Sequence, residues 1–417
     1  MPNTINTNKS APGRIAKVAA TMFADDMQFV KTIAREDQVD FAPQAGGYKT
    51  GDTIFINKPA RFTTGTNRDV TSAIQDITEE KVQMVLNQSF TAAVALTSNE
   101  FATDMAFDSF AMRVLKPLVS QMAQRIESTF IQLACQSTAN VIGTAGSTVF
   151  NTLTMMQANQ RMSELLATGS ENEWIALLSP SAKTSAVDAR KGLFQSSEEI
   201  SKQYKRGVMG LADGFTYLSN NLMYTHTTGS GTQTNGAVTT TANMTNGATT
   251  IAVTGLTGSG TITAGTVFTV AGAFAVHPIT KATLPFLQPF VVTTTATAVS
   301  GAATLSVSPT IYSSAGGGLQ NVSALPNSGA AVVFLTGTAS STPFQNSLTY
   351  CKEAFRFASV PLILPGGMDK AAQETVDGLT IRVLADHDIK TDQYILRIDF
   401  LGGFVPVRPE WAVRVTA

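Results

Sequence analysis

The chain has 417 residues, of which 43% are hydrophobic and 14% charged, and 29 Lys and Arg nearly balance 30 Asp and Glu. This apolar content excludes disorder throughout, and the missing basic surplus argues against a nucleic-acid binder that neutralises phosphates. The two cysteines, Cys135 and Cys351, form no C-x-x-C pair, which disfavours a disulfide framework and a thiolate zinc site. The first residues lack a signal-peptide core, and no apolar run reaches membrane-spanning length. We therefore expect a soluble protein of a reducing compartment.

The first predicted element is an apolar helical stripe between residues 15 and 33, interrupted by Asp25 and Asp26. Its members share the spacing of one helix face and are Ile15, Val18, Met22, Phe29 and Ile33. Such a stripe needs a partner surface. Packing on its own domain is the simpler interpretation, and contact with a neighbouring subunit is the alternative.

A long hairpin is predicted next, because strand-like runs at 53–57 and 81–96 flank a polar middle that carries Arg61, Arg68 and Asp69. A two-stranded extension of this kind is marginally stable alone and usually lies on another surface. The pattern favours assembly over catalysis.

A long helix should begin near Pro117, because apolar residues then recur at helical spacing. They are Leu118, Met122, Ile126, Phe130 and Leu133, whereas Glu127 and the nearby glutamines fall on other faces. Helical periodicity extends over 105–140 and again over 154–206. The methionines in both stretches are expected to be core residues.

From Thr225 to Tyr350 the only charged residue is Lys281, whereas the rest of the chain has an ordinary charge content. Short alternating runs such as TTIAVTGL and TVFTVAG are separated here by Gly, Asn and Pro. This pattern predicts antiparallel strands in a small barrel or sandwich. Because strands return between Gly378 and Val415, we expect a β unit inserted into an α+β host.

Residues with catalytic potential are few. Asp386, His387, Asp388 and Asp392 resemble a metal or acid–base group, but they lie between two strand-like runs, where a polar turn is the favoured interpretation. His226 and His277 have no acidic neighbour in the sequence, and no glycine cluster has phosphate-loop or dinucleotide-loop spacing. We therefore predict no enzyme, no cofactor and no metal site, and keep a metal enzyme at residues 386–392 as an alternative.

Residues 262–293, ITAGTVFTVAGAFAVHPITKATLPFLQPFVVT, resemble the insertion of the P-twenty-two-like coat-protein family of tailed bacteriophages. The family pattern is a G-D-x-F-x-I-A-G turn followed by V-N-P-x-T-K and L-Q-x-F-V-V-T. Residues on this pattern are Gly265, Phe268, Ala271, Gly272, Val276, Pro278, Thr280, Lys281, Leu287, Gln288 and 290–293. Thr266 and His277 depart from it, where the family has an acidic residue and an asparagine. Looser similarity continues in GFTYLSNNLMYTHTTG, NSLTYCKEAFRFASVPL and the terminal strands.

The resemblance implies an HK-ninety-seven-like phage capsid fold, α+β, with an inserted small antiparallel β-barrel of six strands. The implied parts are an N-terminal arm (1–43), an extended loop (44–75), a peripheral domain with a spine helix (76–150), an axial domain in two parts (151–222 and 351–417, the latter with closing peripheral strands) and the inserted barrel (223–350).

It also implies a major capsid protein that forms pentamers and hexamers of an icosahedral virion shell, assembled in the bacterial host cytoplasm. Implied partners are further copies, a scaffolding protein, a portal and weakly held double-stranded DNA; a decoration protein is left open, and no membrane is expected. Candidate intersubunit contacts are Ile15, Val18, Met22, Phe29, Arg61, Phe62 and Arg68. The alternatives are an encapsulin-like compartment, a tail-tube protein and a secreted Thr-rich surface or adhesin protein.

Overall fold

The computed structural model describes residues 12–35, 51–58, 61–62, 74, 80–97, 114–146, 151–167, 174–190, 211–231, 235–365 and 370–416. The chain divides into two compact units. The first comprises residues 1–57, 81–130 and 355–407, and the second comprises residues 58–80, 131–354 and 408–417. Within the described ranges, no helix is long and apolar enough to cross a membrane.

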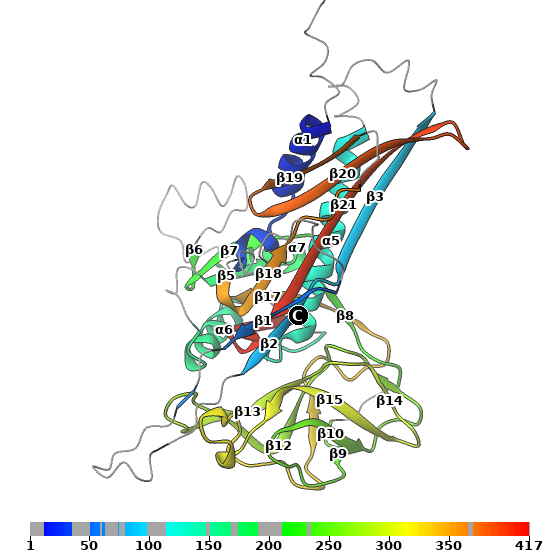
Figure 1. Cartoon of the computed structure of the whole chain (residues 1–417). Helices are drawn as coiled ribbons and strands as arrows, with labels where there is room; N and C mark the ends of the chain where they lie inside the picture. The colour runs from blue at the N-terminus through cyan, green and yellow to red at the C-terminus, as the bar shows by residue number, and fades with distance from the viewer. Residues whose placement is uncertain are drawn as a thin grey trace, which may run out of the picture. The chain divides into compact units, whose positions relative to one another are not determined.

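The first unit is built on an antiparallel sheet of five strands (Figure 1). They are β3 (Gln88–Thr97), β18 (Phe355–Ser359), β19 (Lys370–Val376), β20 (Leu379–Asp388) and β21 (Gln393–Pro406). β3 pairs with residues 393–402 of β21, and β20 and β18 pair with successive stretches of the other side of β21. β19 follows β20 and forms one edge.

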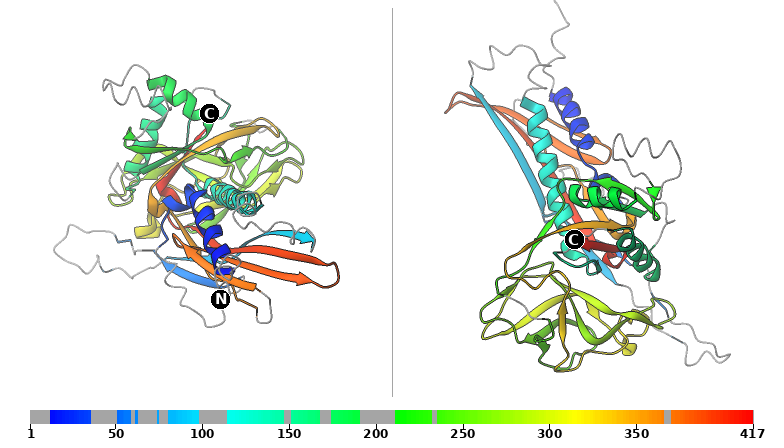
Figure 2. Two further views of the ribbon diagram at one scale, coloured as in Figure 1. Left: turned by 90° about the horizontal axis from the view of Figure 1, so that it is seen from above. Right: turned by 180° about the vertical axis from the view of Figure 1, so that it is seen from behind.

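Helices α1 (Pro12–Asp25) and α2 (Phe29–Thr32) also belong to this unit, as does α5 (Lys116–Ser137) up to Phe130, and Figure 2 shows α1 and α5 beside the sheet. The predicted long helix is confirmed as α5, in which Met122, Ile126 and Phe130 are buried. The Phe130 ring lies 5.3 Å from that of Phe357. The stripe predicted from Ile15 to Ile33 is two helices, because α1 ends at Asp25, where two adjacent carboxylates interrupt the apolar pattern.

A two-stranded ribbon, β1 (Thr53–Asn57) and β2 (Lys81–Val85), also belongs to the first unit. Its inner face is buried through Ile56 and Met84 against Val360, Leu401 and Val405. The outer face exposes Phe55 at 64%. The expected pair of strands at the base of the extended loop is therefore present, but the second strand is shorter than predicted. The run 81–96 divides at Leu86 and Asn87 into β2 and β3, and β3 pairs with β21 instead of β1. Residues 63–73 lie outside the described part.

The second unit contains a seven-stranded sheet. Its strands are β4 (Val141–Ile142), β5 (Trp174–Leu178), β6 (Leu211–Ala212), β7 (Phe215–Ser219), β8 (Thr225–Thr227), β17 (Pro343–Tyr350) and β22 (Ala412–Thr416). Helices α6 (Thr152–Glu164) and α7 (Pro180–Arg190) flank β5 in the chain. The helical pattern predicted for 154–206 is therefore wrong at β5, because a short apolar run such as WIALL fits a buried strand as well as a helix.

The inserted β-barrel is confirmed between β8 and β17. Its six-stranded sheet consists of β16 (Val332–Phe334), β12 (Val267–Val276), β13 (Thr283–Val292), β15 (Ala302–Ile311), β10 (Ala248–Thr254) and β9 (Thr239–Thr240), in that spatial order. A bridge between Thr239 and Ala331 joins the two ends of the sheet, and the Val332 N–H donates to the Val238 carbonyl at 2.8 Å. The interior holds Phe268, Phe290 and further apolar side chains.

Shorter elements also occur among the described residues of the second unit. β11 (Thr261–Ile262) pairs with β14 (Ala296–Thr297), and 3-10 helices are found at η4 (Ser314–Leu319), η5 (Lys352–Ala354) and η6 (Pro409–Trp411). Lys281, the one charge of the insertion, donates from Nζ to the Gly318 carbonyl at 2.7 Å. This ammonium group therefore ties the β12–β13 turn to η4 by a polar contact with backbone.

Candidate assembly surfaces

The N-terminal helix α1 buries a different face from the predicted one. Ala16, Ala19, Ala20 and Phe23 are buried, and the helix packs on β19 and β20. Val18 and Met22 are half-buried, and the side chain of Ile15 lies outside the described residues. The alanines were missed because a hydrophobic pattern gives more weight to large side chains, whereas small ones allow a helix to approach a sheet closely.

Phe29 was expected to contact a neighbouring subunit, and its position does not support this expectation. The ring has no exposed surface and lies 6.1 Å from the Phe355 ring and 6.4 Å from the Phe404 ring. It therefore packs on its own domain, the simpler of the two interpretations of this segment.

Glu127 was placed outside the apolar stripe of the long helix, and the structure shows that this position is nevertheless buried, with the residue only 1% exposed. Its carboxylate accepts hydrogen bonds from the backbone N–H groups of Gln28, at 2.8 Å, and Phe29, at 3.0 Å. These donors are at the start of α2, where the first N–H groups have no partner within the helix. Glu127 thus fixes the arm to α5. Phe29 and Glu127 are 98 residues apart in the chain, so a local sequence pattern does not reveal this contact.

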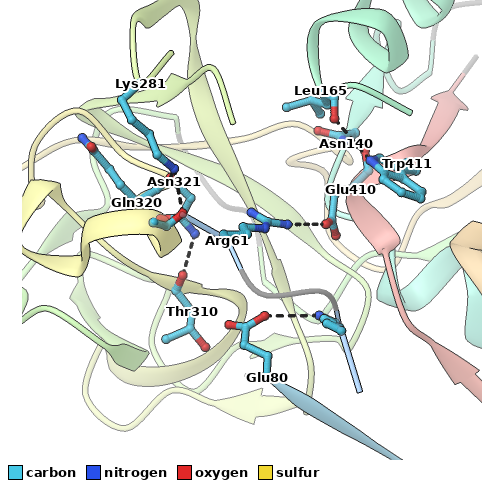
Figure 3. A network of polar contacts seen from close by, with 12 residues as sticks. Arg61, Glu80, Asn140, Leu165, Lys281, Thr310, Gln320, Asn321, Glu410 and Trp411 are labelled. Atoms are coloured by element: carbon cyan, nitrogen blue, oxygen red, sulfur yellow. Dashed lines mark hydrogen bonds and ion pairs between the residues drawn. The ribbon is translucent and has the colours of Figure 1, made fainter. Parts of the chain in front are cut away.

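In the second unit, two ion pairs hold the ends of the segment that joins β1 to β2, which includes part of the extended loop (Figure 3). Lys58 Nζ lies 3.7 Å from a carboxylate oxygen of Glu80, and the Lys58 N–H donates to the Glu80 carbonyl at 2.8 Å. Arg61 Nη2 lies 3.0 Å from Glu410 Oε1 in η6. Phe62 is 54% exposed, and Arg68 lies outside the described residues. Arg61 is thus bound within its own chain, whereas Phe62 presents an apolar surface.

These loop ends border a cleft of about 540 Å³ within the second unit. Trp411 Nε1 donates to the Leu165 carbonyl at 3.2 Å, and Asn140 Nδ2 donates to the Glu410 carbonyl at 2.9 Å (Figure 3). Burial of the nearby Lys281 side chain lowers the pKa of its ammonium group, and the positive charge of Arg61 lowers this pKa further. The ion pairs of Lys58 and Arg61 and the hydrogen bonds of Asn140 and Trp411 therefore hold chain segments together at this cleft.

In the candidate metal group, Asp386, His387 and Asp388 are the last three residues of β20, and Asp392 lies in the turn that leads to β21. Asp388 accepts hydrogen bonds from the Lys390 N–H at 2.9 Å and the Thr391 hydroxyl at 2.8 Å. These bonds lower the pKa of the Asp388 carboxyl, the one from the Lys390 N–H most. His387 Nε2 lies 3.1 Å from Asp392 Oδ1. In the described ranges no three His, Cys, Asp or Glu side chains gather as metal ligands would.

A charged network crosses the five-stranded sheet of the first unit at Asp399, which is 2% exposed. Its carboxylate accepts hydrogen bonds from Arg397 Nε at 2.7 Å, from Arg382 Nη2 at 2.5 Å and from the Thr91 hydroxyl at 2.9 Å. Burial alone would raise the pKa of Asp399, but the hydrogen bonds from Arg397, Arg382 and Thr91 outweigh it and lower the pKa. The network joins β3, β20 and β21.

The second unit buries a cation, Arg414 of β22, with no exposed surface. Arg414 Nη1 donates to the Gly265 carbonyl at 2.8 Å, while Nε and Nη2 have no hydrogen-bond partner among the described residues. Burial lowers the pKa of Arg414 to about 10. Burial lowers the pKa of His226 to about 4, with a smaller contribution from the positive charge of Arg414. Burial raises the pKa of the Cys135 thiol to about 12. Near neutral pH, His226 is therefore uncharged and Cys135 remains a thiol, whereas Arg414 keeps its positive charge.

Comparison with known proteins gives one family and several capsid structures. The model of the family described as P22 coat protein, gene protein 5, matches residues 9–416. A structure from Mycobacterium phage Che8 has 8% identity and a TM-score of 0.44, covering 94% of this chain and 90% of its own. The capsid of Ralstonia phage GP4 has 8% identity and a TM-score of 0.46, and the match covers 93% of this chain and 87% of the GP4 chain. The CUS-3 coat protein I-domain has 24% identity and a TM-score of 0.20, and the match covers 25% of this chain and 100% of the I-domain chain.

No curated protein sequence matches the chain. The family match extends over both units and includes the residues that carried the resemblance to coat proteins. It confirms the expected phage capsid fold and gives no support to the adhesin, encapsulin-like or metal-enzyme alternatives. The chain therefore belongs to the P22 coat protein family and is a structural subunit of a phage capsid, which forms by self-association.

Proposed function

We propose that this coat protein builds an icosahedral shell from pentamers and hexamers around the double-stranded DNA of a tailed phage. The observation that carries the proposal is the coat-protein match over residues 9–416. Large apolar side chains exposed on the extended loop support it, namely Phe62 at 54% and Ile74 at 79%. In a shell, such side chains gain a partner surface and are removed from water.

The proposal assigns a role to each part of the chain. The arm (1–43) and extended loop (44–75) clasp neighbours, the peripheral domain (76–150) and closing strands form the outer part of each capsomer, and the axial domain (151–222, with residues from 351 onward) surrounds its axis. The barrel (223–350) is an insertion between the two parts of the axial domain. Ile15, Val18, Met22, Phe62 and Arg68 remain the candidate contacts, with Arg61 held in place by Glu410.

Scaffolding and portal partners, and assembly in the bacterial cytoplasm, belong to the same proposal. The near-neutral net charge of −1 supports weak contact with DNA, because a strongly basic lining would hold the packaged genome and oppose its release.

Electron microscopy and sedimentation of the chain expressed with its scaffolding protein test the proposal. We expect closed shells from the unmodified chain and fewer from Phe62→Ser, with an unchanged unfolding midpoint of the free subunit. Val299→Ser is the matched control, because Val299 is an apolar side chain of the barrel with 75% exposure. A chain that stays monomeric even with its scaffold present would contradict the proposal.

A further inference from the structure

The five-stranded sheet of the first unit, here called the peripheral sheet, has one edge along β3 that has no strand partner among the described residues. β3 pairs with β21 on one side over all ten of its residues, from Gln88 to Thr97. A strand of this length extends about 33 Å. In antiparallel strands, alternate residues direct both their N–H and C=O groups away from a given neighbour. The outer side of β3 is therefore a row of backbone donors and acceptors suited to another strand.

This edge lacks the features that normally prevent strand addition. Its sequence, QSFTAAVALT, contains no charged residue and no proline. The opposite edge of the same sheet, β19, carries Lys370 and Glu374 and is packed against α1. Proteins that remain monomeric usually protect long edge strands with charges, prolines or covering elements. Charged residues and a packed helix thus protect the β19 edge of the sheet, whereas the β3 edge carries neither a charge nor a proline.

The side chains next to the free edge are also incompletely covered. Phe90 and Val94 are half-buried, although each lies opposite a buried residue of β21, Phe400 and Leu396 respectively. The Phe90 and Phe400 rings are 6.5 Å apart, so this apolar strip continues the core. On the other face of β3, Ala93 and Ala95 are exposed. An added strand would cover the strip that the sheet leaves open.

We propose that the free edge of β3 receives an extended strand of a second copy of this chain, so that the peripheral sheet continues across a subunit boundary. This inference rests on the proposed shell and names one of its contacts. A second copy is the occupant because the chain self-associates and because an uncharged edge offers backbone hydrogen bonds and apolar contact rather than charge recognition.

Hydrogen exchange of the full chain, followed residue by residue in free subunits and in assembled shells, tests this contact. We expect alternate β3 amides to exchange at least tenfold more slowly in shells, while the amides of β19 change little. Shells in which β3 exchanges as it does in free subunits would overturn the inference and leave the proposed function standing. Failure to form any shell would contradict both.

Two further outcomes would also overturn it. Outward β3 amides that are already protected in free subunits would mean that the chain covers its own edge, and protection that appears with scaffolding protein alone would assign the edge to that partner. A pair of variants adds a second readout. Ala95→Lys, opposite the exposed Ile395 of β21, should lower shell yield several-fold without moving the unfolding midpoint, whereas Gln373→Lys on the exposed face of β19 should not lower shell yield.

Discussion

The buried guanidinium of Arg414 allows a quantitative prediction about stability. Its pKa falls from an ordinary 12.5 to about 10 because burial disfavours the charged form. A pKa difference of one corresponds to about 1.4 kcal/mol, so carrying this charge costs the folded second unit about 3 kcal/mol. The hydrogen bond to the Gly265 carbonyl offsets part of that cost, since a bond from a charged donor contributes about 1.5–3 kcal/mol.

Arg414→Met should therefore leave the free energy of unfolding unchanged or raise it by up to about 1.5 kcal/mol, because it removes the buried charge and retains an apolar side chain. Arg161→Met is the contrasting variant, because the Arg161 guanidinium lies 3.4 Å from the centroid of the Phe286 ring. Losing that cation–π contact should lower stability by about 0.5–2 kcal/mol.

Urea unfolding followed by tryptophan fluorescence measures both effects, because Trp174 and Trp411, the two tryptophans of the chain, lie in the second unit. Arg414→Met should shift the midpoint upward or not at all, with an unchanged slope. A loss above about 2 kcal/mol would refute the reasoning, because it would show that the buried charge has compensating partners.

Four further outcomes are expected. Asp399→Asn should destabilise the chain at pH 7 by about 3 kcal/mol. Because the folded pKa of Asp399 is lowered, the stability difference between the variant and the unmodified chain should shrink as pH falls below about 4, and acid-unfolding curves measure it. Glu127→Gln should cost about 1–3 kcal/mol and speed hydrogen exchange at Gln28 and Phe29, whereas exchange as slow as in the unmodified chain would contradict the anchoring role. Cys135 should resist alkylation at pH 8 until the chain is unfolded, and mass spectrometry of labelled peptides checks this. Contacts that the barrel makes in shells should persist as NaCl is raised to 1 M, since Lys281 is its one charge; their selective loss in hydrogen exchange would count against this.

Local patterns predicted the elements that depend on neighbouring residues. The absence of charge on either side of Lys281, together with alternating runs between turn residues, indicated the inserted β unit before any comparison. Regular apolar spacing predicted α5. The same approach failed for β5, whose five apolar residues are too few to separate strand from helix, and for α1, whose buried face is largely alanine.

The sequence by itself thus determined the insertion, the long helix and the coat-protein resemblance, because each depends on composition or on spacing along the chain. Only the tertiary structure decided that Phe29 is buried, that Glu127 binds the start of α2 and that Arg414 is enclosed. It also decided that one edge of β3 has no strand partner in the part of the chain that the structure describes. These properties depend on which surfaces meet after segments far apart in the chain come together. A residue's spacing shows which face it occupies, and folding decides what, if anything, covers that face.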